Sequence, residues 1–367
     1  MSQLFETTQI NGLALKNRFV RSATWTGLSQ ANGKCSMPLI DMYVRLAKGG
    51  AGLLITGHAY VQKKGQAGPW QLGIHNESIL PGLRSLVNAV HENGAKIVIQ
   101  LSHAGIYANA KLTGTAPFAI SDIKGVVPYP VKEMASEDFD AIIECFVKSA
   151  LMAKAAGFDG IQLHAAHGYL ISQSLSPAYN IRKDQYGGSI ENRSLLLLTI
   201  VQKIRKTLGN GYPILVKLNS QDFLNDGLKL NDAIKIACLL EKEVVDAIEI
   251  SGGTRASGDF KSSRTGILAD DHEAYFQEAA RLFKVNLNIP IILVGGIRSY
   301  HVAERLVNSK SADYIAMCRP LIREPELINR WESGDDASTG CISCNGCLAI
   351  GLSGKGVRCK RECLSAM

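Results

Sequence analysis

Two histidines and a tyrosine stand close together in the stretch HAAHGY, as His164, His167 and Tyr169. Imidazole and phenol groups that leave one strand end could hold a carbonyl oxygen and deliver a proton. The histidine pair could instead ligate a metal, but the zinc-protease pattern H-E-x-x-H lies on a helix and contains a glutamate that is missing here. In a third interpretation, both histidines only form hydrogen bonds with loop backbone. Residue types alone favour this interpretation as much as a functional one.

Two further polar residues interrupt apolar runs that predict buried strands. Gln100, in IVIQLS, could offer a donor and an acceptor to a flat heterocycle such as a flavin pyrimidine, although a satisfied buried amide is the commoner role of a single glutamine. Lys217, in ILVKLN, is costly to bury unless a negative charge compensates it. A reduced flavin would supply that charge, and so would an internal ion pair with Glu249 or Asp222.

Glycines and an arginine follow two later apolar runs. Gly295 and Gly296 end one run, and Cys318, Arg319 and Pro320 end the next. In a barrel these would be the seventh and eighth strands, whose loops often bind phosphate through backbone N–H groups. A tight turn would explain either sequence alone, but two such turns at these particular strands favour a phosphate site.

The elements that must position these residues alternate regularly from Asn17 onward. Short β-rich apolar runs and longer segments of helical periodicity predict strand-helix units around a parallel sheet. Eight such units close more readily into a barrel than into an open sheet, and no run is followed by the G-x-G-x-x-G of an open dinucleotide-binding sheet. The fold class is therefore α/β, a (β/α)8 TIM barrel over residues 1–335. The expected strands are 18–25, 53–57, 96–102, 160–165, 214–219, 247–251, 291–295 and 314–317, and the expected helices include 81–92, 136–156, 191–208, 231–243, 271–284 and 300–309.

Composition and charge exclude several classes of protein. With 46% hydrophobic and 20% charged residues, the chain suits a folded protein that has a large core. The net charge of +7 is scattered, which favours anionic ligands such as phosphates and offers no basic stripe for nucleic acid. No apolar run reaches membrane-spanning length, and the first residues lack the features of a signal peptide. We therefore expect a cytoplasmic location and a small-molecule substrate. We expect neither nucleic acid nor a membrane as a partner.

The last part of the chain, residues 336–367, forms a Cys-rich C-terminal extension. Thiolates at such short spacings ligate iron–sulfur clusters and zinc. A 4Fe-4S cluster, zinc, and a tail that binds nothing all remain open, and the spacing slightly favours the cluster. The cysteines are Cys341, Cys344, Cys347, Cys359 and Cys363, of which the first four make the pattern C-x2-C-x2-C-x11-C.

These features, in this order, resemble the Old Yellow Enzyme family of FMN-containing ene-reductases. The similarity covers nearly the whole chain, and the run DGIQLHAAHGYLISQSLSPAYNIRKDQYGGSIENR is its most specific part. The stretches SATWTGL, CIxCN and CL resemble most the branch of 2,4-dienoyl-CoA reductase and trimethylamine dehydrogenase. The chain matches only the barrel domain of that branch. The further matching stretches are LKNRFVRSAT at 15–24, GGAGLLITG at 49–57, IQLSHAG at 99–105, VGGI at 294–297 and RPLIREPEL at 319–327.

The resemblance implies FMN as cofactor and NADH or NADPH as reductant. It places Gln100 at the flavin pyrimidine edge and Lys217 near flavin N1 and O2. The family generally has arginine where Lys217 stands and glycine where Cys318 stands, which leaves the affinity and the redox potential of the flavin open. The other implied roles are Ala23 and Gly57 along the isoalloxazine ring, Gly296, Cys318 and Arg319 at the phosphate with Gly295 beside them, His164 and His167 on the substrate carbonyl oxygen, and Tyr169 as proton donor.

The implied reaction is reduction of the C=C bond of an α,β-unsaturated carbonyl compound, by hydride transfer from the nicotinamide through flavin N5. Two other functions stay open: an electron-transfer flavoprotein subunit whose tail cluster works with a protein partner, and a non-flavin barrel enzyme such as an aldolase or a metal-dependent lyase. A homo-oligomer is also left open.

Two features oppose a simple transfer from the branch that the tail resembles. There the second cysteine gap is usually one residue longer, and further domains feed electrons to the cluster, whereas this sequence ends at Met367, so that a cluster would need an external electron source or would be structural. The stretch SGGTRASGDFKSSR after the sixth strand also lacks the histidine that pairs with the tyrosine in dienoyl-CoA enzymes. That absence weakens a dienoyl-CoA assignment.

Overall fold

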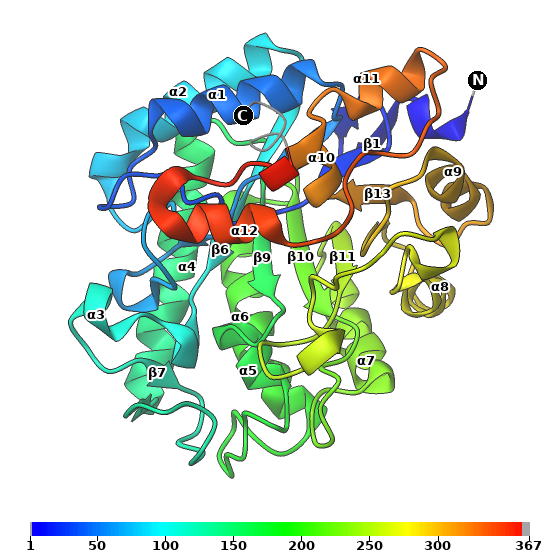
Figure 1. Ribbon diagram of the computed structural model, residues 1–367. Helices are drawn as coiled ribbons and strands as arrows, with labels where there is room; N and C mark the ends of the chain where they lie inside the picture. Colours follow the sequence, from blue (N-terminus) through cyan, green and yellow to red (C-terminus); the bar gives the residue numbers. More distant parts are fainter. Residues whose placement is uncertain (1, 362–367) are drawn as a thin grey trace.

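The computed structural model describes residues 2–361 and contains a closed barrel of eight parallel strands surrounded by helices (Figure 1). The barrel closes because β4 pairs with both β3 and β6, and β13 returns to β3. This confirms the predicted (β/α)8 fold. The barrel strands are β3 (Phe19–Arg21), β4 (Leu53–Ile55), β6 (Lys96–Ser102), β9 (Gly160–Ala165), β10 (Ile214–Asn219), β11 (Ala247–Ser251), β12 (Ile291–Val294) and β13 (Tyr314–Met317).

The inside of the barrel is packed at its N-terminal end. Alternate residues of the strands point inward and form an apolar cluster that includes Leu53, Val98 and Leu215. A hairpin of β1 (Thr8–Ile10) and β2 (Leu13–Leu15) covers this end, and its side chains join the cluster. The open end of the barrel is therefore the opposite one, where the strands finish.

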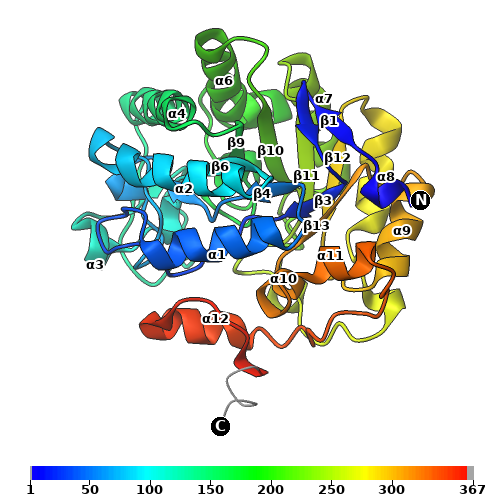
Figure 2. The same cartoon turned by 90° about the horizontal axis from the view of Figure 1, so that it is seen from above.

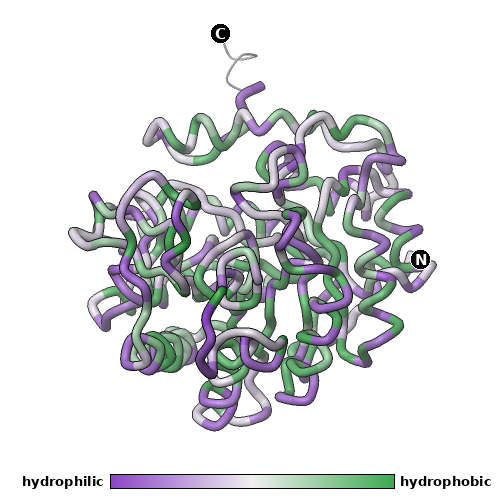
Figure 3. Tube along the Cα trace, turned by 90° about the horizontal axis from the view of Figure 1, so that it is seen from below, coloured by the Kyte–Doolittle hydropathy of each residue, from purple (hydrophilic) through white to green (hydrophobic). Residues whose placement is uncertain are grey.

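The helices cover the outside of the strands with one buried face each, so that hydrophobic and hydrophilic residues alternate along their traces (Figure 3). The predicted helices are confirmed, with one displaced start: the helix expected over 271–284 begins at Gln277, because Ala274 has a left-handed φ of 50° and Asp270–His272 forms a separate 3-10 turn. The helices are α1 (Met37–Lys48), α2 (Leu80–Glu92), α4 (Ser136–Ala156), α6 (Ile190–Leu208), α7 (Leu230–Lys242), α8 (Gln277–Asn286), α9 (Tyr300–Asn308), α10 (Arg319–Arg323) and α11 (Leu327–Glu332).

Three predicted strands are shorter than expected, and the second of them, 53–57, ends at Ile55. The first, 18–25, ends at Arg21, and the following residues turn into the open end of the barrel. The seventh, 291–295, ends at Val294, because Gly295 has a φ of 138° that breaks the extended backbone. The shortened ends of the first and seventh strands contribute residues to the cavity described below.

The long connections after β6 and β9 carry short elements of their own. The first contains α3 (Ala110–Thr113) and a two-stranded sheet of β7 (Phe118–Ala119) and β8 (Lys132–Glu133), and the second contains α5 (Leu170–Leu175). A further short strand, β5 (Ala59–Tyr60), extends the sheet beside the end of β6. These pieces surround the open end of the barrel.

The C-terminal extension packs against this open end. It contains α12 (Gly346–Ile350), followed by a wider helical turn over Gly351–Lys355, and it forms a layer outside α1 and α10 (Figure 2). The Val357 N–H donates to the Thr26 carbonyl at 2.7 Å, which ties the extension to the loop after β3. Cys363 lies outside the described residues. Across residues 2–361, no helix combines the length and the apolar character that crossing a membrane requires.

Candidate functional site

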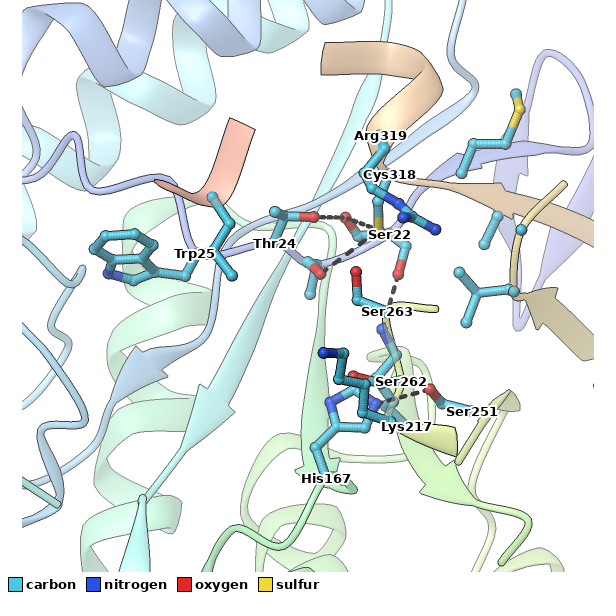
Figure 4. A pocket seen from close by; sticks show the side chains of 18 of the residues that line it. Ser22, Thr24, Trp25, His167, Lys217, Ser251, Ser262, Ser263, Cys318 and Arg319 are labelled. Atoms are coloured by element: carbon cyan, nitrogen blue, oxygen red, sulfur yellow. Dashed lines mark hydrogen bonds between the residues drawn. The ribbon is translucent and has the colours of Figure 1, made fainter. Parts of the chain in front are cut away.

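A cavity of about 520 Å³ opens where the barrel strands end. In Figure 4, His167 and Lys217 approach it from one side, and Cys318 and Arg319 from the other. Gly57 does not line this cavity, because it lies behind the loop after β3, where its N–H donates to the Tyr43 hydroxyl at 3.0 Å. The sequence-predicted residues that do line it are Ala23, Gln100, His164, His167, Tyr169, Lys217, Gly295, Gly296, Cys318 and Arg319.

Lys217 forms a buried ion pair at the floor of the cavity. Its Nζ lies 3.0 Å from Oε1 of Glu249 and donates to the Ser22 hydroxyl at 2.8 Å. The parallel register places Lys217 opposite Glu249 on β11, and Glu249 is fully buried. The Glu249 alternative is therefore confirmed. Asp222 serves elsewhere, since its carboxylate accepts from the Asn219 side chain at 2.8 Å.

Gln100 belongs to the same polar network. Its Nε2 donates to Gln162 Oε1 at 2.7 Å, and Gln162 Nε2 donates in turn to Glu249 Oε2 at 2.8 Å. The amide oxygen of Gln100 is then the group that remains for a ligand N–H. A chain of hydrogen bonds thus links the Gln100 side of the floor to Lys217.

His164, His167 and Tyr169 come together beside this floor. The His164 ring centroid is 5.2 Å from that of His167 and 4.9 Å from that of Tyr169. His167 Nε2 lies 2.7 Å from the Ser251 hydroxyl, which orients the ring (Figure 4). His164 Nδ1 is buried and has no hydrogen-bond partner among the described residues.

Sequence reasoning missed two side chains of this cluster. His58, three residues beyond β4, has its Nε2 3.4 Å from the Tyr169 hydroxyl. Arg255, from the loop after β11, lies over the rings of Tyr107 at 4.7 Å and Tyr169 at 5.9 Å. The position of His58 directly after a predicted strand was a usable signal, because loops at this face of a barrel carry active-site residues. Nothing local to Arg255 indicated its neighbours.

The imidazoles of the cluster are held in the neutral state. Burial, helped by the nearby positive charges of Arg255 and Lys217, lowers the pKa of His58 to about 4. Burial, helped by Lys217, lowers the pKa of His167 to about 3. Burial also lowers the pKa of His164 well below its ordinary value, with smaller contributions from His167 and His58. At neutral pH these rings therefore act as uncharged hydrogen-bonding groups.

Acid should destabilise the protein through these depressed pKa values. A histidine that titrates near 6.5 when unfolded but near 3 or 4 when folded keeps its full stabilising contribution above pH 6.5 and loses it as the pH falls towards 4. Each such group contributes up to about 1.4 kcal/mol per pH unit in that window. We expect urea unfolding to show a lower free energy of unfolding at pH 5.0 than at pH 7.5.

A variant of a buried histidine away from the cavity tests this prediction further. Burial lowers the pKa of His103 to about 3 as well, and its ring is 3.3 Å from Gln62. His103→Gln removes one of the titrating groups, so its free energy of unfolding should depend less steeply on pH than that of the unmodified chain. Equal unfolding free energies at the two pH values in the unmodified chain would contradict the argument.

The opposite wall of the cavity is built from glycines and an arginine. Gly295 and Gly296 have φ values of 138° and 77°, and a Cβ on either would come within 2.9 Å of the Phe276 or Tyr275 ring. Arg319 Nη1 donates to the Arg264 carbonyl at 2.7 Å and to Asn345 Oδ1 at 2.9 Å. Arg319 therefore faces the cavity while it is anchored to the C-terminal extension, a contact that the sequence did not indicate.

The four cysteines of the predicted metal site line one small cavity of about 20 Å³ between the extension and α10, and Cys347 also lines the large cavity. Among residues 2–361, however, no group of three or more His, Cys, Asp or Glu side chains is arranged to hold a metal ion. The structure therefore gathers Cys341, Cys344, Cys347 and Cys359 without supporting the predicted cluster or zinc site.

Comparison with known proteins identifies the family of this barrel. The sequence profile of the NADH:flavin oxidoreductase / NADH oxidase family matches residues 3–337. The chain belongs to that family. This confirms the Old Yellow Enzyme resemblance. Membership of the family makes the chain a flavin-dependent oxidoreductase by class and implies FMN with a nicotinamide reductant.

Curated members of the family align along nearly the whole chain. The NADH oxidase of Thermoanaerobacter brockii is 36% identical over 94% of the chain and 53% of its own length. The metal reductase of Desulforamulus reducens is 37% identical over 98% of the chain and 53% of its own length. An NADPH dehydrogenase of Halalkalibacterium halodurans is 36% identical over 88% of the chain and 92% of its own length. The chain thus spans about half the length of the first two relatives.

Solved structures of the family share the fold. A 2-naphthoyl-CoA reductase in complex with 2-naphthoyl-CoA superposes with a TM-score of 0.90 at 29% identity, covering 97% of this chain and 56% of that one. Histamine dehydrogenase from Rhizobium superposes with a TM-score of 0.87 at 26% identity, over 97% of this chain and 52% of that one.

The cavity itself fits the cofactor that the family implies. One wall has two glycines whose conformation and crowding leave no room for a side chain, next to an arginine, and this combination suits a phosphate. The floor offers the amide oxygen of Gln100 and the ammonium group of Lys217, which suit the polar edge of a flavin ring. The residues present are therefore compatible with FMN.

Proposed function

We propose that this chain is an FMN-dependent ene-reductase that uses NADH or NADPH to reduce the C=C bond of α,β-unsaturated carbonyl compounds. The observation that carries the proposal is the single cavity that joins the Lys217 floor to the neutral cluster of His164, His167 and Tyr169. FMN, when bound there, supplies hydride transfer between the nicotinamide and the alkene.

The cofactor would be held by two groups of residues. The Gln100 oxygen accepts a hydrogen bond from the pyrimidine edge, and Lys217 adds a positive charge that Glu249 partly offsets. Gly295, Gly296, Cys318 and Arg319 hold the phosphate. Compared with a lone buried lysine, the Lys217–Glu249 pair keeps the floor close to neutral.

The histidine pair would bind the substrate. His164 and His167 both line the cavity, and the ring of His167 is oriented by Ser251. Hydrogen bonds from these neutral rings to the carbonyl oxygen polarise the alkene and stabilise the negative charge that develops on that oxygen. Tyr169, beside His164, delivers a proton to the α carbon.

The visible spectrum of the protein, purified without oxygen, tests this proposal. We expect a two-band flavin spectrum that bleaches with NADH and returns when 2-cyclohexenone is added. A protein that stays colourless after FMN is supplied would overturn the flavin assignment and favour a non-flavin barrel enzyme. A reduced flavin that no small enone reoxidises would overturn the ene-reductase assignment alone.

The gathering of four cysteines next to the large cavity favours a second candidate function. We propose that Cys341, Cys344, Cys347 and Cys359 bind a 4Fe-4S cluster or zinc, and that with the cluster the chain serves as an electron-transfer subunit for a protein partner. Rapid anaerobic reduction by NADH without a partner would count against the electron-transfer role.

Metal analysis distinguishes the states of the C-terminal extension. With a cluster we expect about four iron and four sulfide per chain and a broad brown absorbance; zinc would give about one metal ion and no colour. Cys347→Ser should abolish the metal content, whereas Cys145→Ser, on α4, should leave it unchanged. Metal-free protein from an anaerobic preparation would show that the extension binds neither.

A further inference from the structure

We propose that His58 is a positioning residue for Tyr169, directing the phenol proton into the cavity and stabilising the phenolate left after proton transfer. This inference rests on the proposed function, in which Tyr169 is the proton donor. The inference depends on one contact. The side chain of His58, just beyond β4, approaches that of Tyr169, in the loop after β9, although the two residues are 111 positions apart in the sequence.

The contact between the two side chains is close. His58 Nε2 lies 3.4 Å from the Tyr169 hydroxyl, and the rings meet edge to face with their centroids 5.3 Å apart. Across residues 2–361, no other side chain is recorded within hydrogen-bonding distance of that hydroxyl. The other groups close to the Tyr169 ring are the His164 ring, which is tilted against it with the centroids 4.9 Å apart, and the Arg255 guanidinium, which lies over it at 5.9 Å.

His58 is held in place from both sides of its backbone. The preceding residue, Gly57, donates its N–H to the Tyr43 hydroxyl at 3.0 Å, and the His58 carbonyl accepts from Gln71 Nε2 at 3.0 Å. The following residues form β5, which pairs with the end of β6. A side chain on such an anchored backbone can hold a fixed hydrogen-bond geometry, as a positioning residue requires.

The stretch that directly follows β11, residues 252–264, contains no histidine. It supplies Thr254 and Arg255 instead, and Arg255 reaches the ring face without a hydrogen bond to the hydroxyl. The imidazole next to Tyr169 instead follows β4, which is separated from β9 by β6 alone. His58 thus gives the buried phenol of Tyr169 a polar partner.

The proton balance is simple. His58 remains neutral and donates from Nε2–H to the Tyr169 oxygen, which leaves the phenol O–H free to point at the substrate. The proton then passes from Tyr169 to the α carbon, the phenolate oxygen keeps the hydrogen bond from His58, and water returns a proton to Tyr169. Burial and the nearby charges of Arg255 and Lys217 lower the pKa of His58, so that its ring does not compete as an acid.

A double-mutant cycle on the FMN-loaded protein tests the inference. In stopped-flow experiments, NADH first reduces the flavin and 2-cyclohexenone then reoxidises it. We expect His58→Phe to slow reoxidation about tenfold and Tyr169→Phe about a hundredfold. Because His58 acts through Tyr169, combining both changes should slow reoxidation no further than Tyr169→Phe alone, within about twofold.

Two additional readouts separate positioning from a structural role. His58→Gln, whose amide N–H can replace Nε2–H, should restore reoxidation to within about threefold of the unmodified rate. The solvent isotope effect on reoxidation should rise in His58→Phe, because proton transfer becomes slower, while reduction by NADH should change less than about twofold.

The outcomes distinguish the inference from the function beneath it. Multiplicative effects of the two changes, an unaffected His58→Phe, or equal slowing of both half-reactions would overturn the role of His58. Failure of the unmodified protein to be reoxidised by the enone would overturn the proposed function itself, and it would be seen before any variant is made.

Discussion

Replacing His164 and His167 together by alanine is expected to slow alkene reduction by about 10³-fold, because removal of a hydrogen-bond donor to a developing oxyanion typically costs 10²-fold or more. Both rings line the cavity in the neutral state. Reduction of the flavin by NADH needs no carbonyl anchor, so its rate should change by less than about fivefold.

The measurement is the pair of half-reactions in a stopped-flow instrument, with cyclohexenone as oxidant. His164→Asn with His167→Asn is a matched control, because asparagine keeps an N–H donor of smaller reach and should recover part of the lost rate. Equal losses in the two half-reactions would show that the pair shapes the cavity as a whole and does not anchor the substrate carbonyl.

The second large effect concerns stability. Lys217→Met should lower the free energy of unfolding by about 3 to 5 kcal/mol, because removing one partner of a buried ion pair leaves an uncompensated charge. Glu249 is fully buried, and its remaining partners, Ser22 and Gln162, are neutral. Urea denaturation of the FMN-free protein measures this loss without interference from the cofactor.

Two control variants make this second result specific. Lys217→Met with Glu249→Gln removes both charges and should recover most of the lost stability. Lys203→Met breaks an exposed pair with Glu144 at 2.6 Å and should shift the urea midpoint little. Equal midpoints for Lys217→Met and Lys203→Met would contradict a stabilising role for the buried pair.

Much of the barrel could be predicted from local patterns. The runs at 96–102, 160–165 and 214–219 became β6, β9 and β10 with the same bounds, because strands buried on both faces read as short continuous apolar segments. Where a strand ended in a glycine or turned into the cavity, apolar character alone set its end too late, as at Gly295. Gly57 does not line the cavity for a related reason, since a position at a strand end does not say which way its backbone faces.

The sequence by itself determined which residues stand at the carboxyl ends of strands, and therefore that Gln100, His164 and Lys217 meet at one end of a barrel. Only the tertiary structure decided their partners. Lys217 faces Glu249 because of the parallel register of β10 and β11, and Tyr169 meets His58 because only β6 lies between β4 and β9 in the closed barrel. Periodicity describes one element at a time, whereas register, closure and the packing of the extension bring together residues that no local pattern connects.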